Sequence, residues 1–248
     1  MIGRILLFVW LSIATAAYAA PEDIIQRVKA SIVAVGTYLP SRSPQFSFRS
    51  TGFVVGDGTL IITNAHSLAQ SIDIQQMERF VISLPNSGKQ GMEVEIVSTD
   101  RQHDLALLRI KGPPLPALAI RSSDNLREGQ HVYFTGYPIG AVLGLYPATH
   151  RAMVSALTPI AIPAVTSTHL DPKTIRRLTT GVFNVIQLDG TAYPGNSGSP
   201  LYDPETGEVV GVINMVFVKG TKEAAITQPS GITYAIPSTH VQAILKGQ

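Results

Sequence analysis

Short runs of apolar residues rich in Val and Ile recur along most of the chain, and Gly, Pro, Asn and Asp separate them. This feature constrains the fold most strongly, because short apolar runs bounded by turn-forming residues are typical of β-strands. The candidate strands are residues 32–39, 52–55, 60–63, 80–84, 93–98, 106–110, 132–137, 152–157, 184–188, 209–218 and 232–236. Many short strands at regular spacing favour a barrel or a sandwich over alternating strands and helices. We therefore predict an all-β fold.

Local patterns add detail to this prediction. Residues 21–31 are amphipathic, and Ser238 is placed to cap a short final helix over residues 240–246. Asp57-Gly58 lies between two apolar runs, which indicates a hairpin turn. Residues 92–96 alternate between apolar and charged side chains, which predicts a half-buried strand.

The first residues are typical of a secretory signal peptide. Arg4 is the only charged residue before Glu22, residues 5–17 are mostly apolar, and Ala17-Tyr18-Ala19 fits a cleavage site of small residues. The apolar run is shorter than the roughly 20 residues that a membrane-spanning helix needs. We therefore predict a signal peptide over residues 1–19, cleavage after Ala19, export to the periplasm or the medium, and no membrane insertion of the mature chain.

Composition excludes several classes of protein. The chain has 248 residues, of which 45% are hydrophobic and 15% charged, so it is long and apolar enough for a large core and is not a disordered chain. The net charge is only +2, which argues against a nucleic-acid partner. The absence of cysteine excludes disulfides, thiolate metal sites and a Cys nucleophile. The histidines show no metal-ligand spacing, so we predict no metal and no cofactor.

Three separate segments offer a histidine, an aspartate and a serine in chain order. They are Thr63-Asn64-Ala65-His66, residues 103–108 with Asp104, and residues 193–201 with Ser197. A Ser hydroxyl is a weak nucleophile that needs an adjacent base, and imidazole titrates close to neutral pH. Each segment alone also has a plain structural interpretation, as a surface histidine, a turn aspartate or a Gly- and Asn-rich turn. The combination is much more specific than its parts.

These segments resemble those of the trypsin-like (chymotrypsin-fold) serine peptidases, and in particular the bacterial Deg/Htr-type branch. Flanking matches extend the resemblance over about residues 28–246; they lie at residues 52–55, 136–140, 210–214 and 231–237. The resemblance implies two six-stranded antiparallel β-barrels with the active site in the cleft between them. We therefore expect one peptidase domain over residues 20–248, with barrels at about 28–112 and 118–236. From the length of the chain we expect no appended PDZ module.

The resemblance also implies a role for each residue. His66 is the expected general base, Asp104 the residue that orients it, and Ser197 the nucleophile of a serine endopeptidase that acts on polypeptides through an acyl-enzyme. The backbone N–H groups of Gly195 and Ser197 are the expected oxyanion hole, and glycine at 195 and 198 permits the sharp turn that exposes them. Many members of the family carry an Asp at the position of Asn196, and this Asp pairs with the new N-terminal ammonium after propeptide removal. Asn196 is neutral and cannot form this ion pair, so we expect activity without propeptide removal.

The expected substrate pocket contains no charge. By analogy it is lined by Thr191, Asn214, Val216 and Gly231. A basic substrate side chain would find no counter-ion there, so we predict a preference for small or medium apolar side chains. The sequence carries no signal for an oligomeric state.

Two other functions compete with this interpretation. An inactive peptidase-fold protein that serves as a binding module would keep the fold without the reaction. An α/β-hydrolase esterase also uses a turn of the Gly-x-Ser-x-Gly type, but it requires the order serine, acid, histidine and a helix after the serine. In this chain Ser199 replaces the final glycine and a strand is predicted after Ser197.

Overall fold

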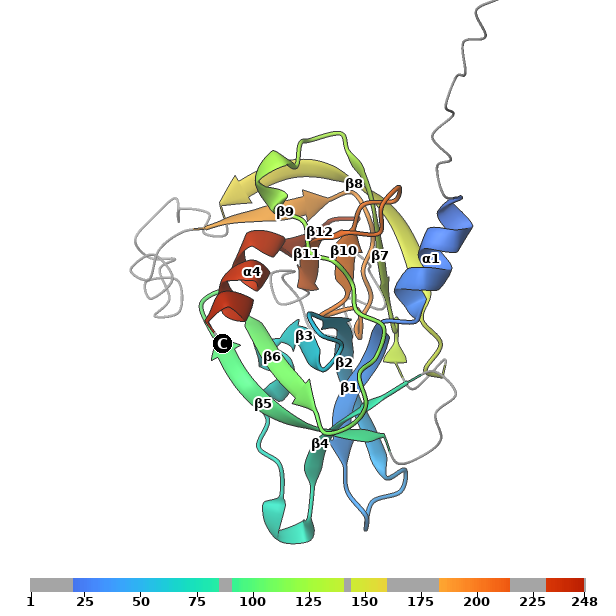
Figure 1. The fold of residues 1–248 in the computed structure, drawn as a ribbon, viewed down its shortest axis with the longest axis vertical. Helices are drawn as coiled ribbons and strands as arrows, with labels where there is room; N and C mark the ends of the chain where they lie inside the picture. The colour runs from blue at the N-terminus through green and yellow to red at the C-terminus, as the bar shows by residue number, and fades with distance from the viewer. Residues whose placement is uncertain (1–19, 85–90, 141–143, 160–182, 215–230, 248) are drawn as a thin grey trace, which may run out of the picture.

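The computed structural model describes residues 20–84, 91–140, 144–159, 183–214 and 231–247. These residues form two closed six-stranded antiparallel barrels, one above the other in Figure 1. The predicted all-β, two-barrel architecture is therefore confirmed. No helix within the described ranges is both long and apolar enough to cross a membrane.

The first barrel closes in the strand order β1-β2-β3-β6-β5-β4. Its strands are β1 (Ile32–Tyr38), β2 (Phe46–Val55), β3 (Leu60–Asn64), β4 (Arg79–Ser83), β5 (Met92–Asp100) and β6 (Leu105–Ile110). The predicted Asp57-Gly58 turn joins β2 to β3, with Gly58 at a positive φ of 89°. Strand β2 begins before the predicted residue 52 because residues 46–51, in which aromatic and polar side chains are mixed, pair with β1. No continuous apolar run indicates this contact.

The second barrel closes in the order β10-β11-β12-β9-β8-β7. Its strands are β7 (His131–Gly136), β8 (Ala148–Pro159), β9 (Asn184–Leu188), β10 (Pro200–Tyr202), β11 (Val209–Asn214) and β12 (Thr233–Pro237). The prediction missed β10, which is only three residues long and starts with a proline. Residues 215–218 of the predicted 209–218 strand lie outside the described residues.

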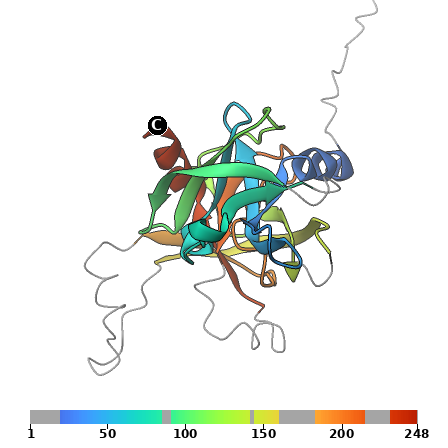
Figure 2. The same cartoon turned by 90° about the horizontal axis from the view of Figure 1, so that it is seen from below.

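Within the described ranges, two α-helices accompany the barrels, toward opposite sides of the molecule in Figures 1 and 2. The amphipathic opening stretch forms α1 (Pro21–Lys29), and the C-terminal helix is α4 (Ser238–Lys246). The predicted helix cap is wrong. Pro237 occupies the N-cap position, while Ser238 is the first helical residue and its buried hydroxyl donates to the carbonyl oxygen of Arg121.

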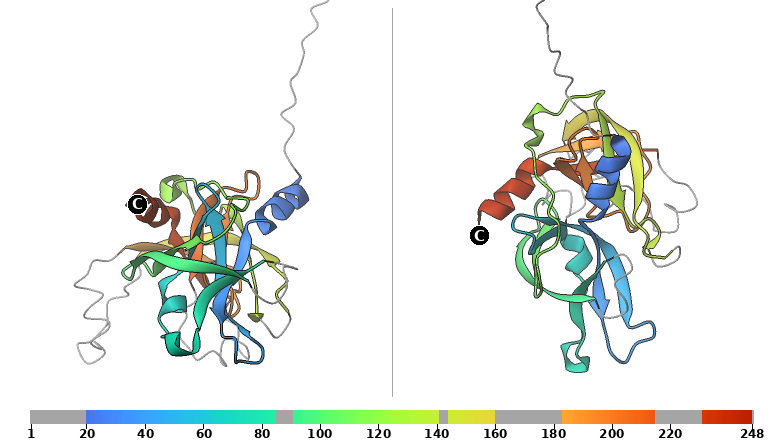
Figure 3. Two further views of the ribbon diagram at one scale, coloured as in Figure 1. Left: turned by 60° about the horizontal axis from the view of Figure 1, so that its bottom comes forward. Right: turned by 45° about the vertical axis from the view of Figure 1, so that its right-hand side comes forward.

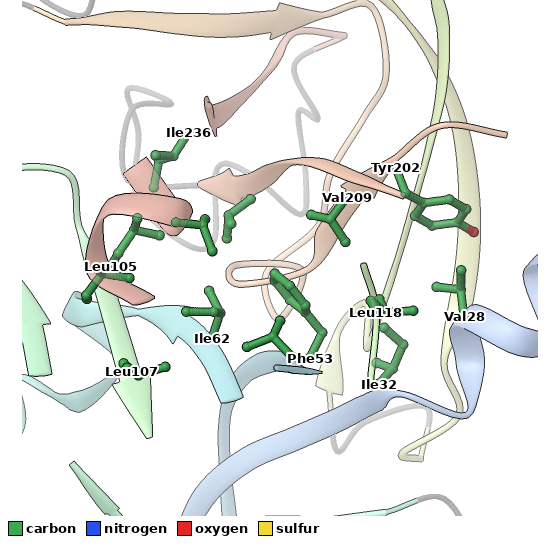
Figure 4. Close-up of a cluster of buried hydrophobic side chains, with 14 of the residues drawn as sticks. Val28, Ile32, Phe53, Ile62, Leu105, Leu107, Leu118, Tyr202, Val209 and Ile236 are labelled. Carbon is green, nitrogen blue, oxygen red and sulfur yellow. The ribbon is translucent and has the colours of Figure 1, made fainter. Parts of the chain in front are cut away.

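Several strands are buried on both faces, which explains why the sequence shows continuous apolar runs. In β1, Val33 and Val35 belong to a cluster with other first-barrel side chains, whereas Ile32 and Ala34 belong to a second cluster. That second cluster, which we call the central cluster, also contains Tyr202 of the second barrel and residues of both helices. Figure 4 shows part of it, with side chains from both barrels facing one another. The barrels therefore share a hydrophobic core, and the views in Figure 3 show them stacked beside α4.

Strand β5 departs from the predicted alternation. Val94 is buried at 5% exposure as expected, but Ile96 is 44% exposed. The pairing of β5 with β6 shifts register between Ile96 and Ser98, and such a bulge reorients the side chains on its strand. The prediction of a half-buried strand is therefore right for Val94 and wrong for Ile96.

Candidate active site

His66 lies in a short 3-10 turn, η1 (Ala65–Leu68), that follows β3 directly. Its ring Nδ1 is 2.6 Å from Oδ2 of Asp104, and its backbone N–H donates to Oδ1 of the same carboxylate at 2.8 Å. Both oxygens of Asp104 therefore hold one residue, through its main chain and its ring. This double attachment fixes the orientation of the imidazole.

Asp104 occupies the turn between β5 and β6, next to Leu105, which pairs with Asn64 at the end of β3. This pairing places the aspartate beside the histidine turn. The Asp104 carbonyl oxygen accepts hydrogen bonds from Ala65 N at 3.1 Å and from Asn64 Nδ2 at 3.0 Å. Asp104 has a φ of +52°, an uncommon conformation for a residue with a Cβ, so neighbouring contacts must stabilise it.

The structure adds one site residue from the second barrel. Asn214, the last residue of β11, is fully buried, and its Nδ2 donates to Asp104 Oδ2 at 2.8 Å. The sequence analysis placed Asn214 only in the substrate pocket. A polar amide at the end of an otherwise apolar strand was the available signal, because buried polar groups are normally hydrogen-bonded.

Ser197 lies in the loop between β9 and β10 and is 6% exposed. Gly195 and Gly198 have φ values of +102° and +84°, and a Cβ would overlap the carbonyl oxygen of Tyr137 at the first and of Thr51 at the second. The expectation that these two positions require glycine is confirmed. Between them, the side-chain amide of Asn196 is buried and makes no hydrogen bond to the described residues.

Thr51 of β2 holds the serine loop against the first barrel. Its N–H donates to Ser197 O at 2.9 Å, and its hydroxyl donates to Gly195 O at 2.7 Å. The Thr51 carbonyl oxygen in turn accepts from Thr63 Oγ1 at 2.8 Å, and Thr63 precedes His66 by three residues on the same segment. Short hydrogen bonds thus connect the serine loop to the strand that leads into the histidine turn.

The structure brings His66 and Asp104 into direct contact, whereas Ser197 is connected to their barrel through its backbone. The hydrogen bonds of the described residues include none between the His66 ring and the Ser197 hydroxyl. Catalytic hydrogen bonds of enzymes without substrate are often long and shorten when substrate binds. The arrangement is therefore compatible with a triad in which substrate completes the last contact.

The remaining predicted pocket residues differ in how exposed they are. Thr191 is half-buried, Gly231 is exposed with open space around it, and Val216 lies outside the described residues. His150 lies beside Tyr193 of the loop before Ser197, with ring centroids 6.3 Å apart, and stacks on Phe134 with centroids 4.8 Å apart. Burial lowers the pKa of His150, which favours its neutral form.

Two antiparallel barrels, with a His–Asp pair on one and a glycine-flanked serine on the other, define the class of trypsin-like peptidases. Comparison with known families agrees, since the trypsin-like peptidase domain matches residues 50–212. The chain belongs to this family.

Individual relatives point to one branch of it. The chain is 28% identical over 210 residues to a probable periplasmic serine endoprotease DegP-like from Marinomonas sp. (strain MWYL1), covering 85% of this chain and 37% of the relative. It is also 28% identical to serine protease HTRA1A of Danio rerio, covering 90% of this chain and 40% of that protein. It thus spans well under half the length of these relatives. Among solved structures, the HtrA-type protease AlgW with decapeptide has a TM-score of 0.65 and 20% identity, covering 92% of this chain and 67% of that one.

Proposed function

We propose that this chain is an exported serine endopeptidase that cleaves peptide bonds with a triad of His66, Asp104 and Ser197. The observation that carries the proposal is the double hydrogen bonding of Asp104 to His66, with the ring contact at 2.6 Å. A plain surface histidine needs no such orientation. Membership of the trypsin-like peptidase family supports the same function.

The contacts assign a proton position to the histidine. Asp104 accepts at Nδ1, so the neutral ring carries its proton there and leaves Nε2 as the base. Nε2 removes the Ser197 proton as the Ser197 oxygen attacks the substrate carbonyl carbon, and the protonated ring then donates that proton to the leaving amine. In the second step, Nε2 removes a proton from water as the water oxygen attacks the acyl carbon. The ring then gives this proton to the Ser197 oxygen, and the acyl group is released. Asp104 stabilises the imidazolium that forms in both steps.

The oxyanion of the tetrahedral intermediate is proposed to bind the N–H groups of Gly195 and Ser197. One bond supports this orientation of the Gly195 N–H: Pro194 O, in the same peptide unit, accepts from Ile139 N at 2.7 Å. A second bond, from the Thr51 hydroxyl to Gly195 O at 2.7 Å, holds Gly195 from its other side. In a trans peptide the N–H points away from the carbonyl oxygen, so the Gly195 N–H is directed away from Ile139. A donor of this kind contributes a factor of about 10²–10³ in rate.

The substrates and the location of the enzyme belong to the same proposal. Residues 1–19 match a signal peptide, and several relatives are named periplasmic endoproteases, which supports export to the periplasm or the medium. We propose polypeptide substrates with small or medium apolar side chains before the cleaved bond, and activity without further processing after signal removal. No nucleic acid or cofactor takes part.

The decisive experiment compares purified mature protein with its Ser197→Ala variant on casein and on a peptide library. We expect the variant to lose activity by at least about 10³-fold and to resist labelling by a fluorophosphonate, because both processes require the Ser197 oxygen. Equal activity of the two proteins would exclude serine chemistry at this residue. A wild-type protein that neither cleaves nor becomes labelled, but binds peptides, would be the inactive binding module. Cleavage mainly after Arg or Lys would contradict the proposed specificity.

A further inference from the structure

A cluster of three aromatic rings lies next to the proposed triad, outside the groups that the reaction uses. His103 and His240 stack with their ring centroids 3.8 Å apart and their planes 18° from parallel. Phe183 presents its edge or face to both, with centroids 4.7 Å from His103 and 5.1 Å from His240. We call these three residues the ring cluster.

The ring cluster joins three parts of the molecule. His103 lies in the turn between β5 and β6 of the first barrel, Phe183 precedes β9 of the second, and His240 lies in the first turn of α4. Figure 1 shows α4 beside β6, close to the start of β9. His103 is also the residue directly before Asp104. The rings therefore connect the C-terminal helix and the second barrel to the turn that carries the proposed catalytic carboxylate.

A second His–Asp pair fixes His103 within this turn. Asp100 accepts from the His103 backbone N–H at 3.0 Å, and its other oxygen lies 2.6 Å from His103 Nδ1. The pattern repeats that of Asp104 and His66, with one carboxylate oxygen for the main chain and one for the ring. Because Asp100 fixes one edge of the His103 ring and His240 covers one face, the ring has little freedom to move.

Asp104 depends on its neighbours for its position. Its left-handed φ of +52° is stable only where surrounding contacts impose it, and its carboxylate must meet His66 Nδ1 at 2.6 Å. Productive geometry at catalytic groups tolerates displacements of only about 0.5 Å. The turn that carries Asp104 is held through both the backbone and the ring of His103, so looser packing of that ring would allow the turn and its carboxylate to shift.

We propose that the ring cluster positions Asp104, with His240 of the C-terminal helix as the residue that clamps His103 in place. The three rings are positioning residues, since none of them contacts the reacting atoms. The catalytic meaning of the inference rests on the proposed peptidase function, but the placement of Asp104 is measurable without it. In this proposal, helix α4 helps to align the triad through the contact of His240 with His103.

The test uses the full mature protein and three variants of α4. His240→Ala removes the stacked ring, His240→Phe restores an aromatic face without a titratable group, and Lys246→Ala is a control on an exposed position of the same helix. The first measurement is the chemical shift and hydrogen exchange of the His66 backbone amide, which donates to Asp104 Oδ1 at 2.8 Å. The second is the rate of fluorophosphonate labelling, with kcat and KM on a peptide that the enzyme cleaves.

For His240→Ala we expect a shifted His66 amide that exchanges about tenfold faster, because local opening becomes easier. We also expect kcat and the labelling rate to fall about tenfold with KM changed less than about twofold. His240→Phe and Lys246→Ala should resemble the wild type in every measurement. An unchanged His66 amide in His240→Ala, or a His240→Phe variant as impaired as His240→Ala, would overturn the proposal. If even the wild type resists labelling, the proposed peptidase function is wrong. The chemical shift and exchange rate of the His66 amide then remain as the test of whether the ring cluster positions Asp104.

Discussion

At the scale of single residues, the most informative contact is the one that crosses from the second barrel to Asp104. Asn214 donates to the carboxylate oxygen that also meets the His66 ring. A donor to a carboxylate stabilises its ionised form, and the ionised form is the one that holds the imidazolium. In the proposed triad, Asn214 therefore helps to orient the carboxylate that holds His66, beside any role in the substrate pocket.

Replacement of Asn214 by Leu, which has the same number of side-chain heavy atoms but no donor, should lower kcat about tenfold, because Asp104 loses a charge-assisted hydrogen bond. Steady-state kinetics on a cleaved peptide checks this. Asn214→Ser, which keeps a short donor, serves as the matched variant and should retain more activity than Asn214→Leu. If Asn214 acts only through the pocket, both substitutions will change KM while kcat stays near the wild-type value.

A second prediction at this scale concerns the acid stability of the protein. Burial and, to a smaller extent, the charge of His103 lower the pKa of His240 to about 4, against the opposing effect of Asp100. The unfolded chain takes up this proton near pH 6.5, before the folded chain does, so stability falls as the pH drops from about 6.5 to about 4.

The variant His240→Phe cannot take up a proton and should lose less stability over this pH window. Because solvent screens part of the interaction, we expect the difference to reach only about 1–2 kcal/mol. Urea midpoints of both proteins between pH 7 and pH 4 measure it. Parallel curves for the two proteins over the whole range would show that His240 titrates alike in the folded and unfolded states.

At the scale of elements, the histidine turn η1 depends on a residue from β2. The Arg49 guanidinium donates to Gln70 O at 3.1 Å and lies near Ser67 O at 3.5 Å, so it caps carbonyl groups at the end of the turn. Its charge also lies over the Phe80 ring at 5.4 Å. Burial lowers the pKa of Arg49, and Glu78 opposes that shift.

Arg49→Met should loosen η1 and lower kcat about three- to tenfold, since the last carbonyls of the turn lose their donor. Arg49→Lys keeps a cation within the same space and should fall between Arg49→Met and the wild type. Kinetics and the thermal midpoint are both required, because a loss of stability without a loss of kcat would assign Arg49 to folding alone.

The sequence predicted elements well where the apolar pattern was strong, and poorly where pairing partners decide. Strand 184–188 was predicted with its correct bounds, whereas residues 46–51 of β2 and the short β10 were not recognised. Ile96 faces solvent because of a bulge that no local pattern indicates. The triad candidates followed from their motifs, but Asn214, Thr51 and Arg49 act through partners distant in the chain, which only the folded arrangement reveals.

At the scale of the whole molecule, the alignment of the proposed triad depends on how the two barrels are joined. His66 and Asp104 belong to the first barrel and Ser197 to the second. Thr51 bridges them near the serine, where its hydroxyl donates to Gly195 O and accepts from Tyr137 N at 3.0 Å. The ring cluster bridges them near Asp104.

Thr51→Val keeps the shape of the side chain but leaves Gly195 O and Tyr137 N without this partner. We expect kcat to fall about tenfold or more, because Gly195, whose N–H is a proposed oxyanion donor, loses a hydrogen bond that holds it in place. Thr51→Ser should restore most of the activity. The thermal midpoint should fall by a few degrees, about the effect of 1 kcal/mol in a domain of this size. Full activity in Thr51→Val would show that the Thr51 hydroxyl does not control the serine loop.

The central cluster also joins residues that lie far apart in the sequence. Ile32 and Phe53 are made early, yet they are covered by Tyr202, Val209 and Ile236, which leave the ribosome much later. A partly synthesised chain therefore exposes apolar residues of the central cluster and at the same time lacks part of the proposed triad. In the proposed peptidase, a complete triad and a covered hydrophobic core therefore arise together, because both require the late strands of the second barrel.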